Sequence, residues 1–270
     1  MTGCPAGGLI PPGEWNEVVV GADALDRLRT DHPEILQHAP RIRVVPAEGA
    51  DLGRASSPFA HPLPTAGRLA KRALDVVLAF AGLVAVLPVL LVAMVAVRFD
   101  SRGPAVFRQV RIGVDGRRFR LYKLRTMYQG NDDRAHRAYV ARLIAGAGER
   151  CDGVYKLVDD PRITRVGRVL RKLSIDELPQ LWNVLKGDMS LVGPRPPLPH
   201  ETELYPARAW GRLRVKPGIT GLWQVSGRCE LSFEDMVSLD VRYWQRWSFL
   251  SDLRILLKTP GTVFSRRGAA

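Results

Sequence analysis

The chain has 270 residues, of which 46% are hydrophobic and 25% are charged, a composition that excludes a disordered or collagen-like protein. An excess of 40 Lys and Arg over 27 Asp and Glu gives a formal net charge of +13, which predicts a polyanionic partner such as nucleic acid, anionic lipid or a phosphorylated substrate. The cysteines Cys4, Cys151 and Cys229 are far apart, which argues against a zinc motif or a disulfide framework.

Residues 1–66 differ from the rest of the chain in charge and in proline content. They hold five basic and eight acidic residues, a net charge of −3, so residues 67–270 carry +16. Nine of the 20 prolines fall in the same segment. We expect a domain boundary near Thr65, preceded by a partly ordered extension with a strand over 17–20, a helix over 22–37 and a strand over 41–45. The first residues lack a basic region and a long apolar stretch, so no signal peptide is expected.

The segment 76–97 is apolar throughout and long enough for a membrane. A straight helix of this length would be roughly 33 Å long, against a hydrocarbon core of about 30 Å. Pro88 lies inside it and removes a backbone hydrogen bond, so a break is expected there. Basic residues flank both ends, which favours the cytoplasmic side for both. We therefore predict a re-entrant helix hairpin over 73–98, with a buried core helix or a plain transmembrane span as the alternatives.

Two alternating segments, 104–112 and 119–126, are separated by Asp115-Gly116, a dipeptide typical of β-hairpin turns. Lys123 and Arg125 are two residues apart on the second predicted strand, so their side chains share a face. That face is a candidate phosphate-binding surface. The alternative is solvated charge on an edge strand.

A polar helix is expected near 132–145, followed by a loop. Apolar residues then recur at helical spacing over 166–173, while arginines at every third position, ending at Arg171, line a different face of the same helix. Three cations on one face repel each other unless an anion or a membrane offsets them.

The stretch 174–180 carries the most chemical information. Pro179 fits only the first turn of a helix, which places Asp176 and Glu177 at or just before a helix N-terminus. One interpretation is purely structural, because Ser174 and Glu177 match a capping box and Asp176 is a suitable N-cap. In the other, Asp176 is a nucleophile towards phosphorus and Glu177 holds Mg²⁺.

Arg195 supports the second interpretation, since prolines on both sides stiffen its loop and aim its guanidinium. Trp182 belongs to an apolar stripe that follows Pro179 and lies either in the core or at the membrane interface.

Two later segments, 236–247 and 250–257, also carry apolar residues at helical spacing. We interpret them as amphipathic interface helices or as packed core. Before them, Gly227-Arg228 either binds a nucleotide or closes a turn.

Six short motifs follow one another between residues 71 and 221. They are residues 71–75 (KRALD), 122–127 (YKLRTM), 171–180 (RKLSIDELPQ), 183–190 (NVLKGDMS), 193–196 (GPRP) and 216–221 (KPGITG). In this order they resemble the bacterial sugar transferases, the monotopic polyprenyl-phosphate sugar-1-phosphate transferases. The resemblance covers roughly residues 67–262.

The resemblance implies an enzyme of the inner membrane that works on the cytoplasmic face. It would move a sugar-1-phosphate from a nucleoside diphosphate sugar, usually a UDP-sugar, to undecaprenyl phosphate, at the start of exopolysaccharide or other surface-glycan synthesis. By the same resemblance Asp176 is the nucleophile, the pair Asp176 and Glu177 is tied to Mg²⁺, and Arg171 and Arg195 bind phosphate. Asp252 matches a further acid of the family. The chain departs from the family at Leu87-Pro88, where a Ser-Pro is common, and the four-helix membrane bundle of larger members has no counterpart in residues 1–66.

We therefore expect an α+β, mostly helical fold, with a re-entrant membrane helix hairpin, amphipathic interface helices and a small β-hairpin or sheet, in a domain over 67–270. A rival class, a nucleic-acid-binding protein, is suggested by the charge, but the apolar segment 76–97 and the lack of a helix-turn-helix, RNP or zinc signature argue against it. A non-catalytic membrane adaptor is disfavoured by the intact Asp176-Glu177 pair. The sequence leaves open the identity of the sugar and whether the chain forms a homo-oligomer.

Overall fold

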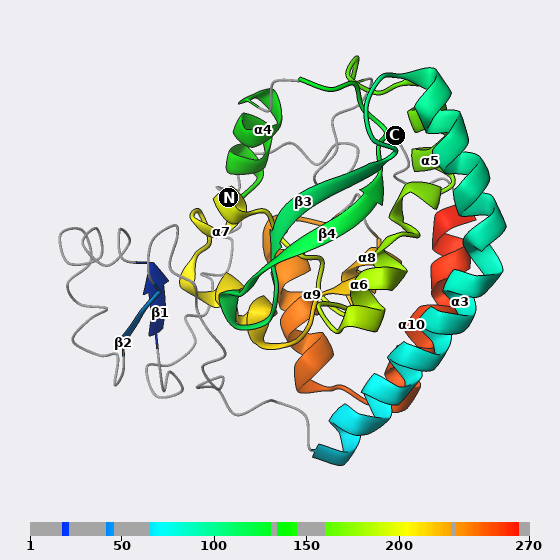
Figure 1. Cartoon of the computed structure of the whole chain (residues 1–270). Helices are drawn as coiled ribbons and strands as arrows, with labels where there is room; N and C mark the ends of the chain where they lie inside the picture. Colours follow the sequence, from blue (N-terminus) through cyan, green and yellow to red (C-terminus); the bar gives the residue numbers. More distant parts are fainter. Residues whose placement is uncertain are drawn as a thin grey trace, which may run out of the picture. The chain divides into compact units, whose positions relative to one another are not determined.

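The structure is a computed structural model that describes residues 18–21, 42–45, 65–130, 134–144, 160–227 and 231–264. The chain divides into two units, Met1–Ala55 and Ser56–Ala270. In the first unit, β1 (Val18–Gly21) and β2 (Ile42–Val45) pair in parallel (Figure 1). Both predicted strands are thus confirmed, whereas the helix predicted over 22–37 lies outside the described residues. The boundary near Thr65 stays a prediction.

The second unit is mostly helical and contains two small two-stranded sheets (Figure 1). Its elements are α3 (Thr65–Asp100), β3 (Val106–Ile112), η1 (Val114–Gly116), β4 (Arg118–Leu124), α4 (Arg134–Ile144), α5 (Arg165–Lys172), η2 (Ile175–Glu177), α6 (Gln180–Lys186), β5 (Ser190–Val192), α7 (Pro199–Thr202), η3 (Ala207–Arg214), β6 (Gly218–Thr220), α8 (Leu222–Val225), α9 (Phe233–Gln245) and α10 (Phe249–Phe264). Strands β3 and β4 are antiparallel, and β5 and β6 are parallel. The mostly helical α+β prediction is confirmed at this level.

The β3–β4 hairpin turns where Asp115-Gly116 predicted it. Asp115 and Gly116 have φ values of 55° and 78°, the left-handed region that a tight hairpin turn needs. The amide of Gly113 donates to the carbonyl of Arg117 at 2.7 Å and closes the turn. The position of this turn therefore follows from the conformational preferences of Asp115 and Gly116 alone.

Helix α3 is continuous from Thr65 to Asp100, with Pro88 inside it. The two separate helical arms predicted from Pro88 are therefore not found, and the prediction of a break is corrected. A proline removes only its own N–H from the hydrogen-bond ladder, so a long helix can bend around it instead of ending. Figure 1 shows α3 following such a bent course.

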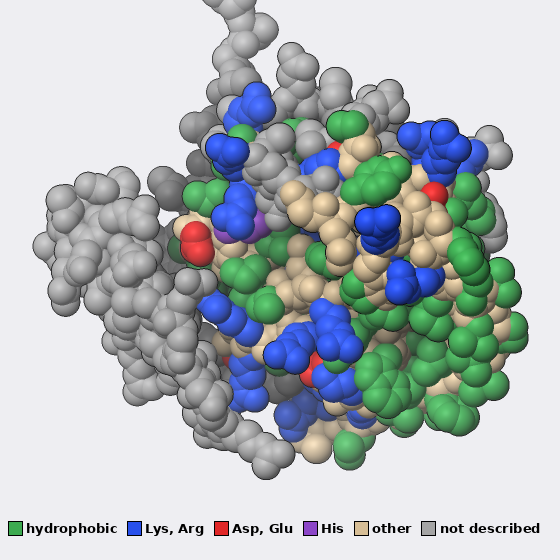
Figure 2. Space-filling view, turned by 45° about the horizontal axis from the view of Figure 1, so that its top comes forward, with side chains coloured by type: hydrophobic (Ala, Val, Ile, Leu, Met, Phe, Trp, Pro, Cys, Tyr) green, Lys and Arg blue, Asp and Glu red, His purple; other side chains and the backbone are tan. Residues whose placement is uncertain are grey.

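Only one narrow stripe of α3 is buried, and its remaining faces expose large apolar side chains. The buried stripe consists of Asp75, Ala79, Leu90, Ala93 and Val97. The exposed set includes Val77, Phe80, Val84, Leu87, Val89, Leu91, Val92, Val95 and Phe99. Among the described residues, α3 is the one helix long and apolar enough to cross a membrane. Figure 2 shows hydrophobic side chains gathered over the side of the unit that carries α3.

Polar side chains fasten the first turns of α3 to the rest of the unit. The Lys71 ammonium donates to a carboxylate oxygen of Asp252 in α10 at 2.6 Å. Asp75 accepts hydrogen bonds from the amide of Leu191 at 2.9 Å and the hydroxyl of Ser190 at 3.0 Å. Arg72 donates to two carbonyls at the end of α6. The charged residues of the motif 71–75 therefore attach the beginning of α3 to α6, β5 and α10.

The last turn of α3 is fastened in a similar way. The guanidinium of Arg125 donates to the carbonyls of Ser101 at 2.6 Å, Arg102 at 2.7 Å and Val97 at 3.3 Å. Ser101 and Arg102 follow the last residue of α3, and the carbonyl of Val97 also accepts from the amide of Ser101 at 3.3 Å. A cation at this negative end of the helix dipole is favourable. Both ends of α3 thus contact the same folded unit.

Buried Asn183 joins α6 to the hairpin. Its side-chain oxygen accepts from the amide of Tyr122 at 3.1 Å, and its nitrogen donates to the carbonyl of Arg120 at 2.7 Å. The Asn183 side chain thus makes the backbone hydrogen bonds with β4 that a neighbouring strand would otherwise make. This contact places the start of α6, and the segment before it, against the hairpin.

Replacing Asp252 with Asn should destabilise the unit without abolishing its fold. Asp252 is 1% exposed and accepts from Lys71, Tyr243 and Trp247. Losing its charge leaves a largely buried ammonium without a counter-ion, for which we expect a loss of about 3 kcal/mol. The measurement is the thermal unfolding midpoint in detergent, with Glu203→Gln as an exposed control. Equal midpoints for the two variants would show that the Lys71–Asp252 pair is not a significant anchor.

Candidate active site

The Asp176-Glu177 pair lies in η2, a short turn that separates α5 from α6. Ser174 precedes it in the left-handed conformation, with φ 54°, which is unusual for a residue other than glycine. The side chain of Ser174 makes no capping hydrogen bond, and the N-cap of α6 is Pro179. The structural interpretation of the pair as a capping box and N-cap is therefore wrong. Because local capping does not explain the acids, a chemical role is favoured.

The two acids of the pair differ in exposure and in neighbours. Asp176 is buried, with 8% of its surface exposed. Glu177 keeps 36% of its side chain exposed, and its carboxylate lies 3.2 Å from the Lys123 ammonium of β4. The structure thus brings together two predicted site residues, Lys123 and Glu177, from segments 54 residues apart.

Arg171 occupies the last turn of α5, three residues before Ser174, and α5 packs against η2. The helix starts at Thr164, whose side chain accepts from the amide of Gly167 at 2.9 Å. The close packing of Gly167 against the backbone of Thr126 leaves no room for a Cβ atom. This contact fixes α5 against the segment that follows β4.

The loop that carries Arg195 is held by β6 and by the segment before it. The amide of Gly193 donates to the carbonyl of Thr220 and the amide of Gly218 to the carbonyl of Pro194, both at 2.8 Å. A Cβ atom on Gly193 would collide with the backbone of Lys216. Motifs 193–196 and 216–221 therefore form one rigid substructure.

Arg111 of β3 holds the same loop from the other side, a role that the sequence did not suggest. Its guanidinium donates to the carbonyl of Pro196 at 3.0 Å and to the side-chain oxygen of Gln109 at 2.7 Å. The amide of Ile112 donates to the carbonyl of Pro197 at 3.0 Å. Only the tertiary pairing of hairpin and loop reveals these contacts.

Glu201 of α7 completes a buried charge cluster with Arg111 and Arg195, and it was also missed from the sequence. It is fully buried, and its carboxylate lies 3.6 Å from the Arg195 guanidinium. Neither carboxylate oxygen accepts a hydrogen bond from the described residues. Burial, followed by the charge of Arg195, lowers the pKa of Arg111 to about 10, while Glu201 and Glu177 oppose this shift.

Arg111 also feels the charge of Glu177, so two cations and two anions meet here. Arg195 keeps 24% of its side chain exposed, whereas Glu201 is fully buried. Arg195 is therefore the cation of the cluster that a phosphate group can reach from solvent. The predicted role of Arg195 in phosphate binding fits this geometry.

Three other candidate residues have different positions. Arg125 is buried at the end of α3, where its guanidinium donates to the carbonyls of Ser101 and Arg102, and its predicted phosphate contact stays a prediction. Asp252 is enclosed by Lys71, Tyr243 and Trp247, which indicates a structural role. Arg228 lies outside the described residues.

Of the two segments predicted as interface helices or packed core, α9 lies in the core and α10 has an exposed apolar face. In α9, Met236 and Tyr243 are buried, so this helix belongs to the core. In α10, Leu250 and Leu257 are exposed, as is Trp182 of α6. Both α10 and α6 pack on α3. These exposed apolar side chains therefore belong to helices that pack on α3, which is compatible with the interface interpretation.

Comparisons with known proteins agree on one family. The family model described as bacterial sugar transferase matches residues 66–266. The exopolysaccharide production protein ExoY of Rhizobium meliloti is 43% identical over 220 residues, which cover 80% of this chain and 96% of that protein. The UDP-glucose:undecaprenyl-phosphate glucose-1-phosphate transferase of Caulobacter vibrioides is 40% identical over 258 residues, 92% and 85% of the two chains. The undecaprenyl-phosphate galactose phosphotransferase of Salmonella typhimurium is 43% identical over 202 residues, 75% of this chain and 42% of that protein.

Glu201→Gln should weaken the binding of UDP-glucose, the donor in the name of the Caulobacter relative. Without the carboxylate, Arg111 and Arg195 repel each other and Arg195 loses its orientation. We expect a Kd increase of about tenfold by calorimetry, or about 1.4 kcal/mol. Glu203→Gln, an exposed change in the next turn, should have no effect.

A double-mutant cycle with Arg195→Lys tests whether Glu201 acts through Arg195. Lys cannot make the planar two-pronged contact of Arg, so Arg195→Lys should itself bind more weakly, and adding Glu201→Gln should cost little more. Additive effects, or tighter binding by Glu201→Gln, would contradict the orienting role.

Proposed function

Because the chain belongs to the bacterial sugar transferase family, we propose that it transfers a sugar-1-phosphate from a UDP-hexose to undecaprenyl phosphate and releases UMP. This reaction is the first membrane step of exopolysaccharide or other surface-glycan synthesis. The names of two relatives support the acceptor, since both contain undecaprenyl phosphate and a sugar transferred with phosphate. The observation that carries the proposal is the Asp176-Glu177 pair, which lies beside Lys123 and is not used for helix capping.

The proposed reaction has two steps at one phosphorus atom. An Asp176 carboxylate oxygen attacks the phosphorus that bears the sugar, the anhydride bond to UMP breaks, and an aspartyl phospho-sugar forms. A phosphate oxygen of undecaprenyl phosphate then attacks the same phosphorus and releases Asp176. Negative charge builds up on the phosphate oxygens in both steps, and cations that are already in place stabilise it. Arg195, held by Arg111 and Glu201, and Lys123 are positioned to do so.

We propose that Mg²⁺ assists, with Glu177 as its main ligand and Asp176 as a second. Among the described residues no group of three or more His, Cys, Asp or Glu side chains could hold a metal ion alone. Mg²⁺ often binds through one or two carboxylates together with substrate phosphates and water, so the pair fits a site that the diphosphate completes. When bound, the ion would supply positive charge at the leaving phosphate.

We further propose that α3 enters and leaves the cytoplasmic leaflet of the inner membrane. Its exposed apolar faces need a non-aqueous environment. Its first turns contact Asp252 and Ser190, and its last turn contacts Arg125, and all three partners belong to one folded unit. A helix with ends on opposite sides of a bilayer could not keep both sets of contacts. This supports re-entrance through a bent continuous helix.

The topology can be tested by cysteine labelling in a background that lacks the native cysteines. Cysteines at position 66, in the first turn of α3, and at position 203, well after α3, should both resist an impermeant maleimide in intact spheroplasts and react after lysis. Val92, 71% exposed in the structure, lies on the apolar face of α3. A cysteine there should react only after the membrane is dissolved. Labelling of positions 66 and 203 from opposite sides would establish a full span.

Asp176→Asn should abolish the covalent intermediate, because an amide is a poor nucleophile and cannot form an acyl phosphate. Radiolabelled UDP-hexose, supplied with Mg²⁺ and without acceptor, should leave label on the wild-type protein and none on this variant. Glu177→Gln should give a weaker signal that needs more Mg²⁺. Thermal unfolding checks that both variants are folded. A folded Asp176→Asn protein that still traps label would place the nucleophile elsewhere.

A further inference from the structure

A cavity of about 910 Å³ opens between the beginning of β3 and the segment that follows β4. Its walls are mostly apolar and include Phe107, Met127 and Tyr128, with Pro104 at one end. Phe107 and Tyr128 are each almost half exposed, which is unusual for aromatic side chains that line a hollow. The cavity therefore offers apolar surface that the described residues leave uncovered.

One end of the cavity adjoins the candidate active site. Phe107 and Lys123 are direct partners in the antiparallel register of β3 and β4. Directly paired residues of two antiparallel strands project from the same face, with Cβ atoms about 5 Å apart. Lys123 in turn contacts Glu177 at 3.2 Å. An apolar group against Phe107 would thus lie one side chain away from the acidic pair.

The other end adjoins α3. Arg125 forms part of the cavity wall, and its guanidinium donates to the carbonyls of Ser101 and Arg102, which directly follow α3. Pro104 follows α3 after a short link, and Phe99 in the last turn of the helix is 87% exposed. The exposed apolar end of α3 and the cavity are therefore separated by only four residues of chain, 100–103.

We propose that this cavity binds the first isoprene units of the lipid acceptor and directs its phosphate to Asp176. This inference rests on the proposed function. The acceptor has an apolar chain that emerges from the membrane and a single phosphate at its end. That combination matches a cavity with the apolar helix at one end and cations with the acidic pair at the other.

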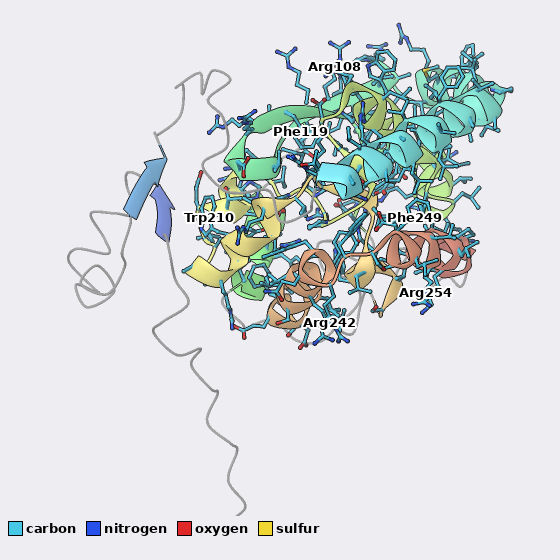
Figure 3. All side chains as sticks on the ribbon, turned by 90° about the horizontal axis from the view of Figure 1, so that it is seen from below. Arg108, Phe119, Trp210, Arg242, Phe249 and Arg254 are labelled. Atoms are coloured by element: carbon cyan, nitrogen blue, oxygen red, sulfur yellow. The ribbon has the colours of Figure 1, made fainter. Side chains whose placement is uncertain are left out.

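A nucleotide sugar matches the cavity less well. Its uracil ring can stack on one aromatic side chain, but its ribose, diphosphate and sugar are polar and would leave most of the apolar wall uncovered. Arg108 lies on the rim and is exposed. Figure 3 shows it at the edge of the unit formed by the hairpin, on the opposite side from Arg242 and Arg254. It is available to attract an anionic headgroup towards the opening.

The two-step reaction allows the acceptor site to be tested apart from the donor site. Phe107→Ala and Tyr128→Ala should trap label from UDP-hexose at the wild-type rate. Discharge of that label to undecaprenyl phosphate in mixed micelles should slow at least tenfold at subsaturating acceptor, with a raised apparent KM for the lipid. Leu204→Ala, which removes an exposed leucine away from the cavity, should leave both steps unchanged.

A photoreactive acceptor, with a diazirine on its first isoprene unit, provides a second measurement that needs no mutation. Cross-links to residues 104–130 are expected, and cross-links confined to other segments would overturn the proposal. Normal discharge by both variants would overturn it as well. Loss of label trapping would assign the cavity to the nucleotide sugar instead. A wild-type protein that traps no label and transfers no sugar would refute the proposed function itself.

Discussion

Buried polar contacts fasten both ends of α3 to a single folded unit, and the rest of the structure depends on this constraint. The Lys71–Asp252 pair, with side chains 13% and 1% exposed, holds the beginning of the helix, and Arg125 holds its end. Apolar packing alone would not specify one position, because most of the surface of α3 is apolar and can slide against lipid or protein. Charged groups that must find particular partners specify that position. The position of the Asp176-Glu177 pair relative to α3 follows from it.

The β3–β4 hairpin connects α3 to the residues of the candidate active site. Side chains on one strand face alternate in function: Lys123 contacts Glu177, while Arg125, two residues further, holds α3. On the partner strand Arg111 holds the loop that carries Arg195. Helix α3, the Asp176-Glu177 pair and the loop that carries Arg195 are therefore all attached to one two-stranded element. A displacement of the hairpin would move all three together, which keeps their relative geometry.

The sequence predicted those features that depend on neighbouring residues. The Asp115-Gly116 turn, the helix that ends near Arg171 and the apolar segment were all found where they were expected. The sequence failed where a partner lies far away along the chain. The alternation of side chains along a strand correctly predicted that Lys123 and Arg125 lie on one face of β4. Their contact partners, Glu177 and the carbonyls at the end of α3, depend on the tertiary fold. Glu201 gave no signal at all, since its importance comes only from burial beside Arg195. The effect of Pro88 was overestimated, because a proline removes only one backbone hydrogen bond and a long helix can bend around it.

The two ends of α3 have partners at very different distances along the chain, which matters while the protein is being made. Arg125 follows Ser101 by 24 residues, whereas Asp252 follows Lys71 by 181. At a translation rate of about 5–20 residues per second, roughly 10–40 s pass between the synthesis of Lys71 and that of its partner. During that interval the ribosome has released a strongly apolar helix whose first turns carry unpaired charges. The lipid surface, or a chaperone that shields apolar segments, must hold α3 until the last helices emerge and complete its docking.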